Sequence, residues 1–280
     1  MSSFRLIRPE IQASGTVFAV PHSGRAYPAA FLEQSVLSRQ AIRSSEDAWV
    51  DLLFEDAPQL GAPLLVAKAP RAYVDLNRSC DELDPALIAG LASVGINPRV
   101  SSGLGVIPRV VAGGRSIYRG KISGAEVAER LQHVWYPYHS ALEKLLGDAV
   151  ASFGQSLLID CHSMPHEAVA QAPGAPQIVL GDRFGAAAGS DIMDQVEAAF
   201  QRTGLRVARN APFAGVFMVR QYGRPSVGRH AVQVEIDRAL YMDEAGLTRH
   251  DGFDELKEMM REVAAELVQI GRSDVRLAAQ

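Results

Sequence analysis

The feature that most constrains the fold is a repeated alternation of two kinds of segment. Short runs of β-branched and aliphatic residues are separated by longer segments with apolar residues every three to four positions. The first pattern is typical of buried strands and the second of amphipathic helices. Their alternation over the whole length predicts an α/β fold, with a largely parallel sheet and helices on both faces. The expected strands are 16–22, 63–69, 72–77, 156–162, 176–182, 206–210 and 230–237, and the expected helices are 30–42, 46–60, 123–154, 190–204 and 253–271.

Length and composition fit a single domain with a sizeable core. The chain has 280 residues, of which 48% are hydrophobic and 21% charged, as in ordinary globular proteins. No repeat or low-complexity linker divides it, so residues 1–280 are predicted to form one domain. Segment 108–124 is rich in Gly and Arg and has weak periodicity. A long loop of this kind is usually a lid or a binding loop.

Charge and cysteine content exclude several classes of function. The net charge is −4 and no dense basic block occurs, so neither nucleic acid nor a membrane surface is an expected partner. No segment reaches the roughly 18 uninterrupted apolar residues of a membrane helix. The N-terminal residues lack the apolar core of a secretory signal. Cys80 and Cys161 are too few for a disulfide framework, so a reducing cytoplasm is the expected location.

Polar side chains gather where predicted strands end. The stretch LLIDCHS places Asp160 and His162 at the end of one apolar run, and His22 follows another. Ligands of α/β proteins collect at the carboxyl ends of strands, and two histidines with one carboxylate are common zinc ligands. Asp47 or Glu46 is a candidate for the carboxylate. Asp160 lies two residues before His162, so it shares that face of the strand and is placed either to accept the other imidazole N–H or to cap the next turn.

Two further strand ends carry charge. Glu235 lies between Val234 and Ile236, where burial raises a carboxyl pKa unless a cation is near. A functional carboxylate and a salt bridge to a nearby arginine are both compatible with this pattern. Asn77 and Arg78 close the run AYVDLNRS. A guanidinium at such a place matches a substrate carboxylate with two hydrogen bonds, although a surface ion pair is the plainer interpretation.

Eight short motifs in a fixed order resemble those of the N-formylglutamate amidohydrolase family, and the similarity spans nearly the whole chain. Each motif alone is weak, but their order is specific for a family. The motifs are PHSG (21–24), ED (46–47), VDLNRS (74–79), YRGKIS (118–123), WYPYHSAL (135–142), LLIDCHS (157–163), QYGRP (221–225) and HAVQVEI (230–236).

The resemblance implies a fold and a reaction. The fold is a zinc-carboxypeptidase-like three-layer α/β/α sandwich with a mixed, mostly parallel sheet. The reaction is metal-dependent cleavage of N-formyl-L-glutamate into formate and L-glutamate, in histidine degradation. One Zn²⁺ per chain is expected, with ligands His22, His162 and Asp47, Glu46 being the alternative acid. The expected partner is a small molecule with a carboxylate.

The remaining roles follow from the same resemblance and from loop positions. Glu235 resembles the carboxylate that takes a proton from the attacking water, and Asn77 with Arg78 resembles a carboxylate anchor. Arg119, in the predicted loop, is the candidate for the oxyanion or for a second substrate carboxylate. Tyr222 and Arg224 are expected to complete the wall of the substrate pocket.

Three other functions compete with this prediction. Segment 213–223 and the stretch after DCHS differ from the histidine-pathway pattern, which leaves open another N-acyl amino acid or a short peptide as substrate. A metal-free binding protein of the same fold is a second alternative. A cysteine hydrolase using Cys161 and His162 is disfavoured, because neighbours on a strand point to opposite faces. The sequence does not indicate an oligomeric state.

Overall fold

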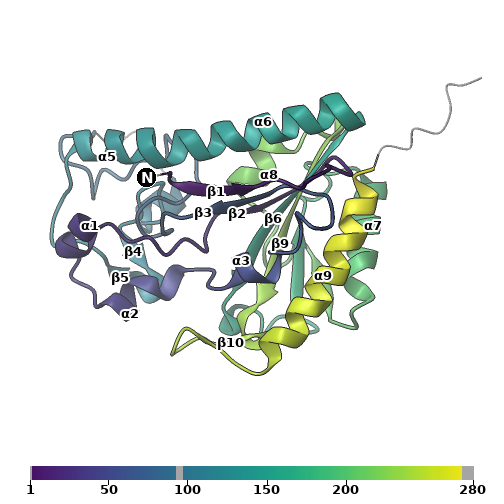
Figure 1. Cartoon of the computed structure of the whole chain (residues 1–280). Helices are drawn as coiled ribbons and strands as arrows, with labels where there is room; N and C mark the ends of the chain where they lie inside the picture. The colour runs from purple at the N-terminus through teal and green to yellow at the C-terminus, as the bar shows by residue number, and fades with distance from the viewer. Residues whose placement is uncertain (1, 93–96, 273–280) are drawn as a thin grey trace, which may run out of the picture.

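A computed structural model describes residues 2–92 and 97–272 of the chain. Within them, seven strands form one sheet in the order β1-β3-β2-β6-β9-β7-β8 (Figure 1). The central strands β3, β2, β6 and β9 run parallel to one another. β1 pairs antiparallel with β3, and β7 pairs antiparallel with β9. β8 runs parallel to β7. The strands are β1 (Phe4–Ile7), β2 (Thr16–Val20), β3 (Leu64–Ala67), β6 (Ser156–Met164), β7 (Ile178–Gly181), β8 (Val207–Arg209) and β9 (Arg229–Asp237).

Helices cover both faces of this sheet. α6 and α8 pack on one face, and α3, α7 and α9 on the other (Figure 1). The predicted three-layer α/β/α fold with a mixed, mostly parallel sheet is therefore confirmed. No helix in the described residues is both long enough and apolar enough to cross a membrane. The helices are α1 (Ala29–Gln34), α2 (Arg39–Ile42), α3 (Val50–Leu53), α4 (Pro98–Ser101), α5 (Gly124–Arg130), α6 (Tyr136–Phe153), α7 (Ser190–Gln201), α8 (Phe217–Tyr222) and α9 (Gly252–Ile270), with a π-helical turn at Leu131–Trp135.

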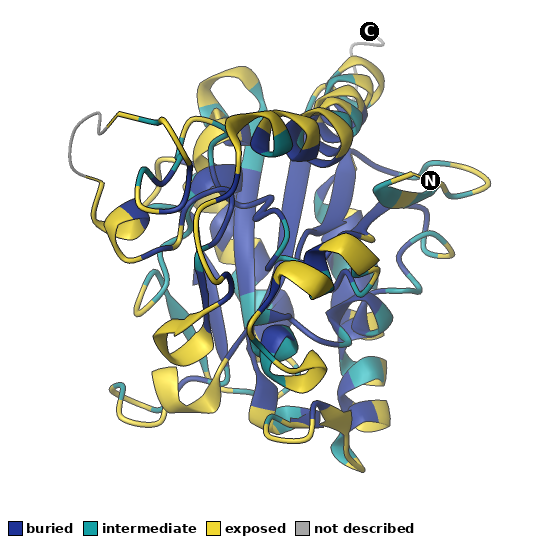
Figure 2. Ribbon diagram, turned by 90° about the vertical axis from the view of Figure 1, so that its left-hand side faces the viewer, coloured by how far each residue is buried: buried dark blue, intermediate teal, exposed yellow. Residues whose placement is uncertain are grey.

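The two faces of the sheet carry separate cores because side chains alternate along each strand. On β6, Ile159 and Cys161 join the core under α9, whereas Leu158 joins the core under α6. Asp160 and His162 follow Leu158 on its own face, where the apolar layer gives way to polar groups. Figure 2 shows the strands buried at the centre and the exposed residues on the outer surfaces of the helices.

The largest error of the predicted strands concerns residues 72–77, which form turns rather than a strand. Their backbone groups are bonded outside any ladder: the Asp75 N–H donates to the Val106 carbonyl, and the Leu76 carbonyl accepts from His139. Alternating apolar residues indicate a strand only where a partner strand is available. Here the polar residues of the run are drawn into the site instead.

Several other predicted elements differ in extent. Segment 46–60 contains only the short α3 and a series of turns, and segment 30–42 is divided into α1 and α2. β1 and α8 were not predicted. Segment 108–124 holds a small two-stranded ribbon, β4 (Val110–Val111) with β5 (Arg115–Ser116). Its first residues line a cavity, as expected for a binding loop.

Shorter elements complete the chain. A second ribbon pairs β10 (Met242–Asp243) with β11 (Thr248–Arg249). Single 3₁₀ turns lie at Arg43–Ser45, Ala112–Gly114, His166–Ala168, Pro225–Val227 and Arg238–Leu240.

Candidate active site

His22 and Asp47 are brought together by backbone contacts between two loops. His22 lies two residues beyond the end of β2, and its carbonyl accepts from the Asp47 N–H at 3.1 Å. The Ser23 hydroxyl donates to the Asp47 carbonyl at 2.6 Å. Gly24 lets the first loop pass the segment that follows β3, since a Cβ there would lie 2.0 Å from the Ala69 carbonyl oxygen. This close approach, rather than a positive φ, is the reason for the glycine in PHSG.

His162 reaches the same point from β6. Its Nδ1 lies 2.9 Å from Oδ2 of Asp47, and its Nε2 lies 2.9 Å from Oδ1 of Asp160. His22 is arranged in the same way: its Nε2 lies 2.8 Å from Oδ1 of Asp75, and its Nδ1 lies 3.3 Å from Oδ2 of Asp47. Each imidazole therefore has one nitrogen toward an outer carboxylate and the other toward Asp47. Asp160 thus lies beside Nε2 of His162, the nitrogen that faces away from Asp47, as its position two residues earlier on the strand predicts.

This geometry suits a cation. One donor atom from each of His22, Asp47 and His162 lies within 4.8 Å of the others, and all three residues are buried. With its Nε2–H directed to Asp75, His22 presents a lone pair at Nδ1 toward a carboxylate oxygen. That nitrogen is buried and has no hydrogen-bond partner. The lone pairs of His22 Nδ1 and the Asp47 carboxylate repel each other unless a positive charge lies between them. Carboxylates placed as Asp75 and Asp160 are, at the far nitrogen of the imidazole, are typical partners of metal-binding histidines. The donor set fits zinc.

Asp47 and Asp75 stay ionised although they are buried. Burial alone would raise the pKa of Asp47, but its contacts with His162 and His22 outweigh that effect and hold the pKa well below the usual range. For Asp75, Arg71 and His22 likewise overcome burial and lower the pKa. Two ionised carboxylates within one buried cluster attract a cation.

Glu235 lies beside His162 on the neighbouring strand, because β6 and β9 pair these two residues in register. Its Oε1 accepts from Nε2 of Gln233 at 2.8 Å. Among the described residues no arginine or lysine forms a salt bridge with it, so the ion-pair interpretation is wrong. Burial raises its pKa to about 7, although nearby His162 acts to lower it. A carboxyl group with such a pKa is suited to both taking and returning a proton near neutral pH.

A cavity of about 770 Å³ opens onto this cluster. His22, His162 and Glu235 line it together with loop residues, and its size is in the range of small-molecule sites. The guanidinium groups in its lining are those of Arg71, Arg78, Arg99 and Arg238. Such a cavity favours an anionic ligand.

Asn77 and Arg78 lie in this lining, and both are held by hydrogen bonds. The Asn77 side-chain oxygen accepts from the Met218 N–H at 2.8 Å. Nε of Arg78 donates to the Leu104 carbonyl at 3.0 Å, and its Nη1 donates to the Asn77 carbonyl at 2.9 Å. Burial lowers the pKa of Arg78 from its ordinary value, but a guanidinium stays charged at neutral pH.

Three predicted side chains lie away from the cavity. Arg119 follows the β4–β5 ribbon, is exposed, and does not line the cavity. Tyr222 is buried, and its hydroxyl bonds to Nδ1 of His139 at 2.7 Å, on the far side of the Asn77 loop. Arg224 is exposed just before β9, whose opposite end carries Glu235. These assignments are corrected: each motif adjoins the site in sequence order, but the fold turns these side chains elsewhere.

Glu46, the alternative acidic ligand, points away from the histidines. Its carboxylate accepts from the Tyr27 hydroxyl at 2.7 Å and from the Arg43 guanidinium at 3.0 Å. Neighbouring residues in an extended segment project to opposite sides, so only one of the pair can face the cluster.

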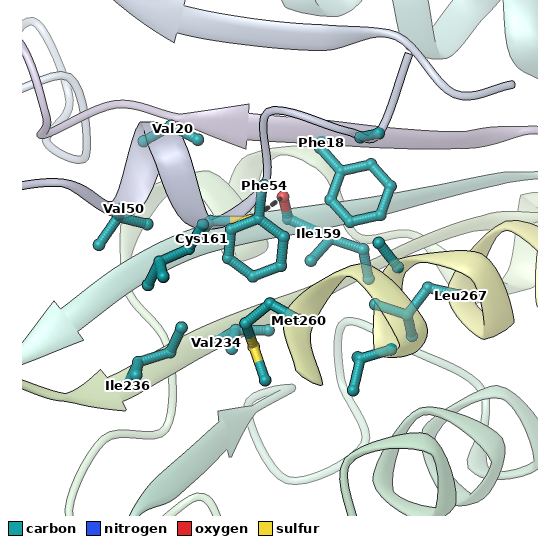
Figure 3. Close-up of a cluster of buried hydrophobic side chains, with 14 of the residues drawn as sticks. Phe18, Val20, Val50, Phe54, Ile159, Cys161, Val234, Ile236, Met260 and Leu267 are labelled. Carbon is teal, nitrogen blue, oxygen red and sulfur yellow. Dashed lines mark hydrogen bonds between the residues drawn. The ribbon is translucent and has the colours of Figure 1, made fainter. Parts of the chain in front are cut away.

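Cys161 takes no part in the site. Figure 3 shows it among apolar side chains between the sheet and α9, with Sγ directed to the Ile159 carbonyl. Burial raises the pKa of this thiol well above its ordinary value. A buried, protonated thiol on the opposite face from His162 is not a nucleophile.

Sequence reasoning missed two arginines. Arg71 donates from Nε to Oδ2 of Asp75 at 3.0 Å, and Arg238 donates from Nη2 to Oδ1 of Asp47 at 3.0 Å. Arg238 also bonds to the Ser163 hydroxyl. Arg238 directly follows the strand that carries Glu235, and this position in the sequence could have marked it as a site residue. Arg71 lies in a turn after Pro70, and nothing in the local sequence indicates a site residue there.

Fold and site together define an α/β/α enzyme with a candidate metal centre at the carboxyl ends of its strands. The model of the N-formylglutamate amidohydrolase family matches residues 14–242. The chain therefore belongs to this family of hydrolases that act on linear amides.

Individual proteins are similar over nearly the whole length. A protein of Pseudomonas aeruginosa named N-formylglutamate deformylase is 30% identical over 91% of this chain and 93% of its own. One of the same name from Pseudomonas putida is 28% identical over 81% of this chain and 82% of its own. The crystal structure of N-formylglutamate amidohydrolase from Ralstonia eutropha JMP134 superposes with a TM-score of 0.91 at 35% identity, covering 97% of this chain and 99% of that one.

Proposed function

We propose that this protein hydrolyses the amide bond of N-formyl-L-glutamate, releasing formate and L-glutamate. The names of its relatives in two Pseudomonas species and in Ralstonia eutropha support this substrate. The observation that carries the proposal is the buried group of His22, Asp47 and His162, with Glu235 paired to His162 on the next strand. The proposal includes the role in histidine degradation and the cytoplasmic location expected from the sequence.

In this proposal His22, Asp47 and His162 hold one zinc ion. Bound zinc would supply Lewis-acid chemistry, which means activating a water and polarising a carbonyl. Arg238 fixes Asp47 by bonding to Oδ1, which leaves Oδ2 to face the two imidazoles. Asp75 fixes the ring of His22 through Nε2, and Asp160 places its charge 2.9 Å from the outer nitrogen of His162.

Glu235 is the proposed general base and acid. It accepts a proton from the attacking water and returns one to the departing amine, so its own protonation state is restored in each cycle. Gln233 orients the carboxylate by donating to Oε1, which leaves Oε2 available as the proton acceptor. A pKa of about 7 is consistent with both transfers near neutral pH.

Two arginines of the cavity are assigned to the negative groups of the substrate. Arg78, held at Leu104 and Asn77, binds the α-carboxylate of the substrate. Arg71 lines the cavity together with His22 and Glu235. We therefore assign to Arg71 the stabilisation of the negative charge that develops on the formyl oxygen. It takes the role expected of Arg119, which is exposed outside the cavity.

An assay of formate release from N-formyl-L-glutamate tests the proposal. Activity should be lost after treatment with a chelator and should return with zinc. A panel of N-formyl and N-acetyl amino acids, followed by release of free amine, decides between this substrate and a related one. Protein that contains zinc but cleaves no member of the panel would refute the reaction. Protein that neither binds zinc nor cleaves would instead support the metal-free binding protein.

A further inference from the structure

The motif WYPYHSAL (135–142) has no role in the proposed reaction, although it lies beside the site. Its residues open α6, the long helix that runs along one face of the sheet (Figure 1). α5 and α6 are joined by a π-helical turn at Leu131–Trp135, in which the Tyr136 N–H donates to the Leu131 carbonyl. Pro137 follows and lacks an N–H, so an ordinary helical bond to residue 133 cannot form. Such π-turns change the direction in which a side chain leaves a helix.

Trp135 and His139 project together from this helix toward the Asn77–Arg78 loop. They are four residues apart and therefore share a face, and their ring centroids lie 4.1 Å apart. Nε1 of Trp135 donates to the Arg78 carbonyl at 2.9 Å, and Nε2 of His139 lies 3.0 Å from the Leu76 carbonyl oxygen. The Tyr222 hydroxyl lies 2.7 Å from the other ring nitrogen of His139. With Tyr222 as donor, His139 is the tautomer that carries its hydrogen on Nε2.

The Asn77–Arg78 loop needs side-chain hydrogen-bond donors because it has no strand beside it. The three successive carbonyls of Leu76, Asn77 and Arg78 accept hydrogen bonds from side chains, the middle one from Arg78 itself. Buried backbone groups must be paired, so replacing one of these donors frees part of the loop. Neither Trp135 nor His139 lines the cavity, so neither contacts a substrate there directly.

We propose that Trp135 and His139 are positioning residues that fix the carboxylate anchor, Asn77 with Arg78, from behind. The inference rests on the proposed function, since it gives Arg78 a substrate carboxylate to bind. It gives a reason for the π-turn that ends at Trp135: the turn directs the indole N–H to the Arg78 carbonyl. A role in packing alone would need the rings but not the N–H.

The test replaces Trp135 by Phe, which keeps an aromatic ring beside His139 and Phe217 and removes the donor. KM for N-formyl-L-glutamate should rise about fivefold, the effect of one lost hydrogen bond, while kcat changes less than about twofold. Tyr136→Phe is the matched control, because Tyr136 is adjacent, exposed and aromatic, and should leave both constants unchanged. An unchanged KM in Trp135→Phe, or an equal fall in kcat, contradicts the proposal.

A double-mutant cycle with Arg78→Ala separates positioning from general loosening. If Trp135 acts through Arg78, Trp135→Phe should have little further effect on KM once Arg78 is absent. Additive effects would show that the indole acts elsewhere. If Trp135→Phe does not fold, 3-benzothienylalanine at position 135 keeps the bicyclic shape without the N–H, and the same rise in KM is expected.

The outcomes also separate this inference from the proposed function. A wild-type protein that does not cleave N-formyl-L-glutamate or the other panel members refutes the function. An active wild type whose KM does not respond to loss of the indole N–H refutes only the positioning role.

Discussion

At the scale of single residues, adjacent acids have different tasks. Asp47 faces two imidazoles and is fixed by Arg238, whereas Glu46 is bonded to Tyr27 and Arg43. The sequence could narrow the acidic ligand to this pair but not decide between them. The choice depends on which side of the segment meets His162, a residue 115 positions away in the chain.

This difference predicts opposite outcomes for two conservative changes. Asp47→Asn removes the anionic donor and should weaken zinc binding at least a hundredfold, because the loss of even an outer partner costs about ten- to a hundredfold. Glu46→Gln should leave zinc affinity unchanged. Isothermal titration of zinc into metal-free protein measures both. Equal affinities in the two variants would show that Asp47 is not a ligand.

Glu235→Gln tests the proton-transfer role. The amide keeps the size of the side chain and its neighbour Gln233 but cannot accept a proton, so kcat should fall on the order of a hundredfold or more. Zinc content should stay at the wild-type value, since Glu235 is not among the proposed ligands. Normal turnover in this variant would remove Glu235 from the mechanism.

At the scale of elements, the parallel strands at the centre of the sheet were predicted well. The apolar runs of β2, β6 and β9 end in His22, His162 and Glu235, and parallel pairing brings these ends together. Residues 72–77 show the limit of this reasoning. Their bonds go to Val106 and His139, distant partners that local sequence does not reveal. For the same reason Arg71 could not be found beforehand.

Helix α6 carries a pH-sensitive element in His139. Burial lowers the pKa of this imidazole to about 3, from an ordinary value of 6.5 in the unfolded chain. The folded state therefore gains stability from neutral His139 above pH 6.5 and loses it as the pH falls, because the unfolded chain binds the proton first. At pH 5 the loss from this group is about 2 kcal/mol.

Urea unfolding at pH 7 and pH 5 measures this contribution when wild type is compared with His139→Gln. Glutamine can still donate to the Leu76 carbonyl but does not titrate. The variant should lose less stability than wild type between the two pH values. The same loss in both proteins would show that His139 is protonated in the folded state.

At the scale of the whole molecule, the two faces of the sheet differ in purpose. The face under α7 and α9 is a continuous apolar core that includes Cys161 (Figure 3). The face under α6 and α8 is apolar only toward the amino ends of its strands and becomes the site beyond Leu158. The layers were predictable from periodicity, and the polar strand ends indicated where the site begins. Apart from the binding loop within 108–124, the loops that enclose the cavity were not predictable, because their side chains are placed by contacts between distant segments.

The central claim is that His22, Asp47 and His162 bind one metal ion on which catalysis depends. The most direct test measures zinc per chain and formate release in parallel, for wild type and His162→Ala, after chelation and again after zinc is restored. Wild type should recover one zinc per chain together with its activity, and His162→Ala should recover neither. Stoichiometric zinc in His162→Ala, or full activity in metal-free wild type, would contradict the claim.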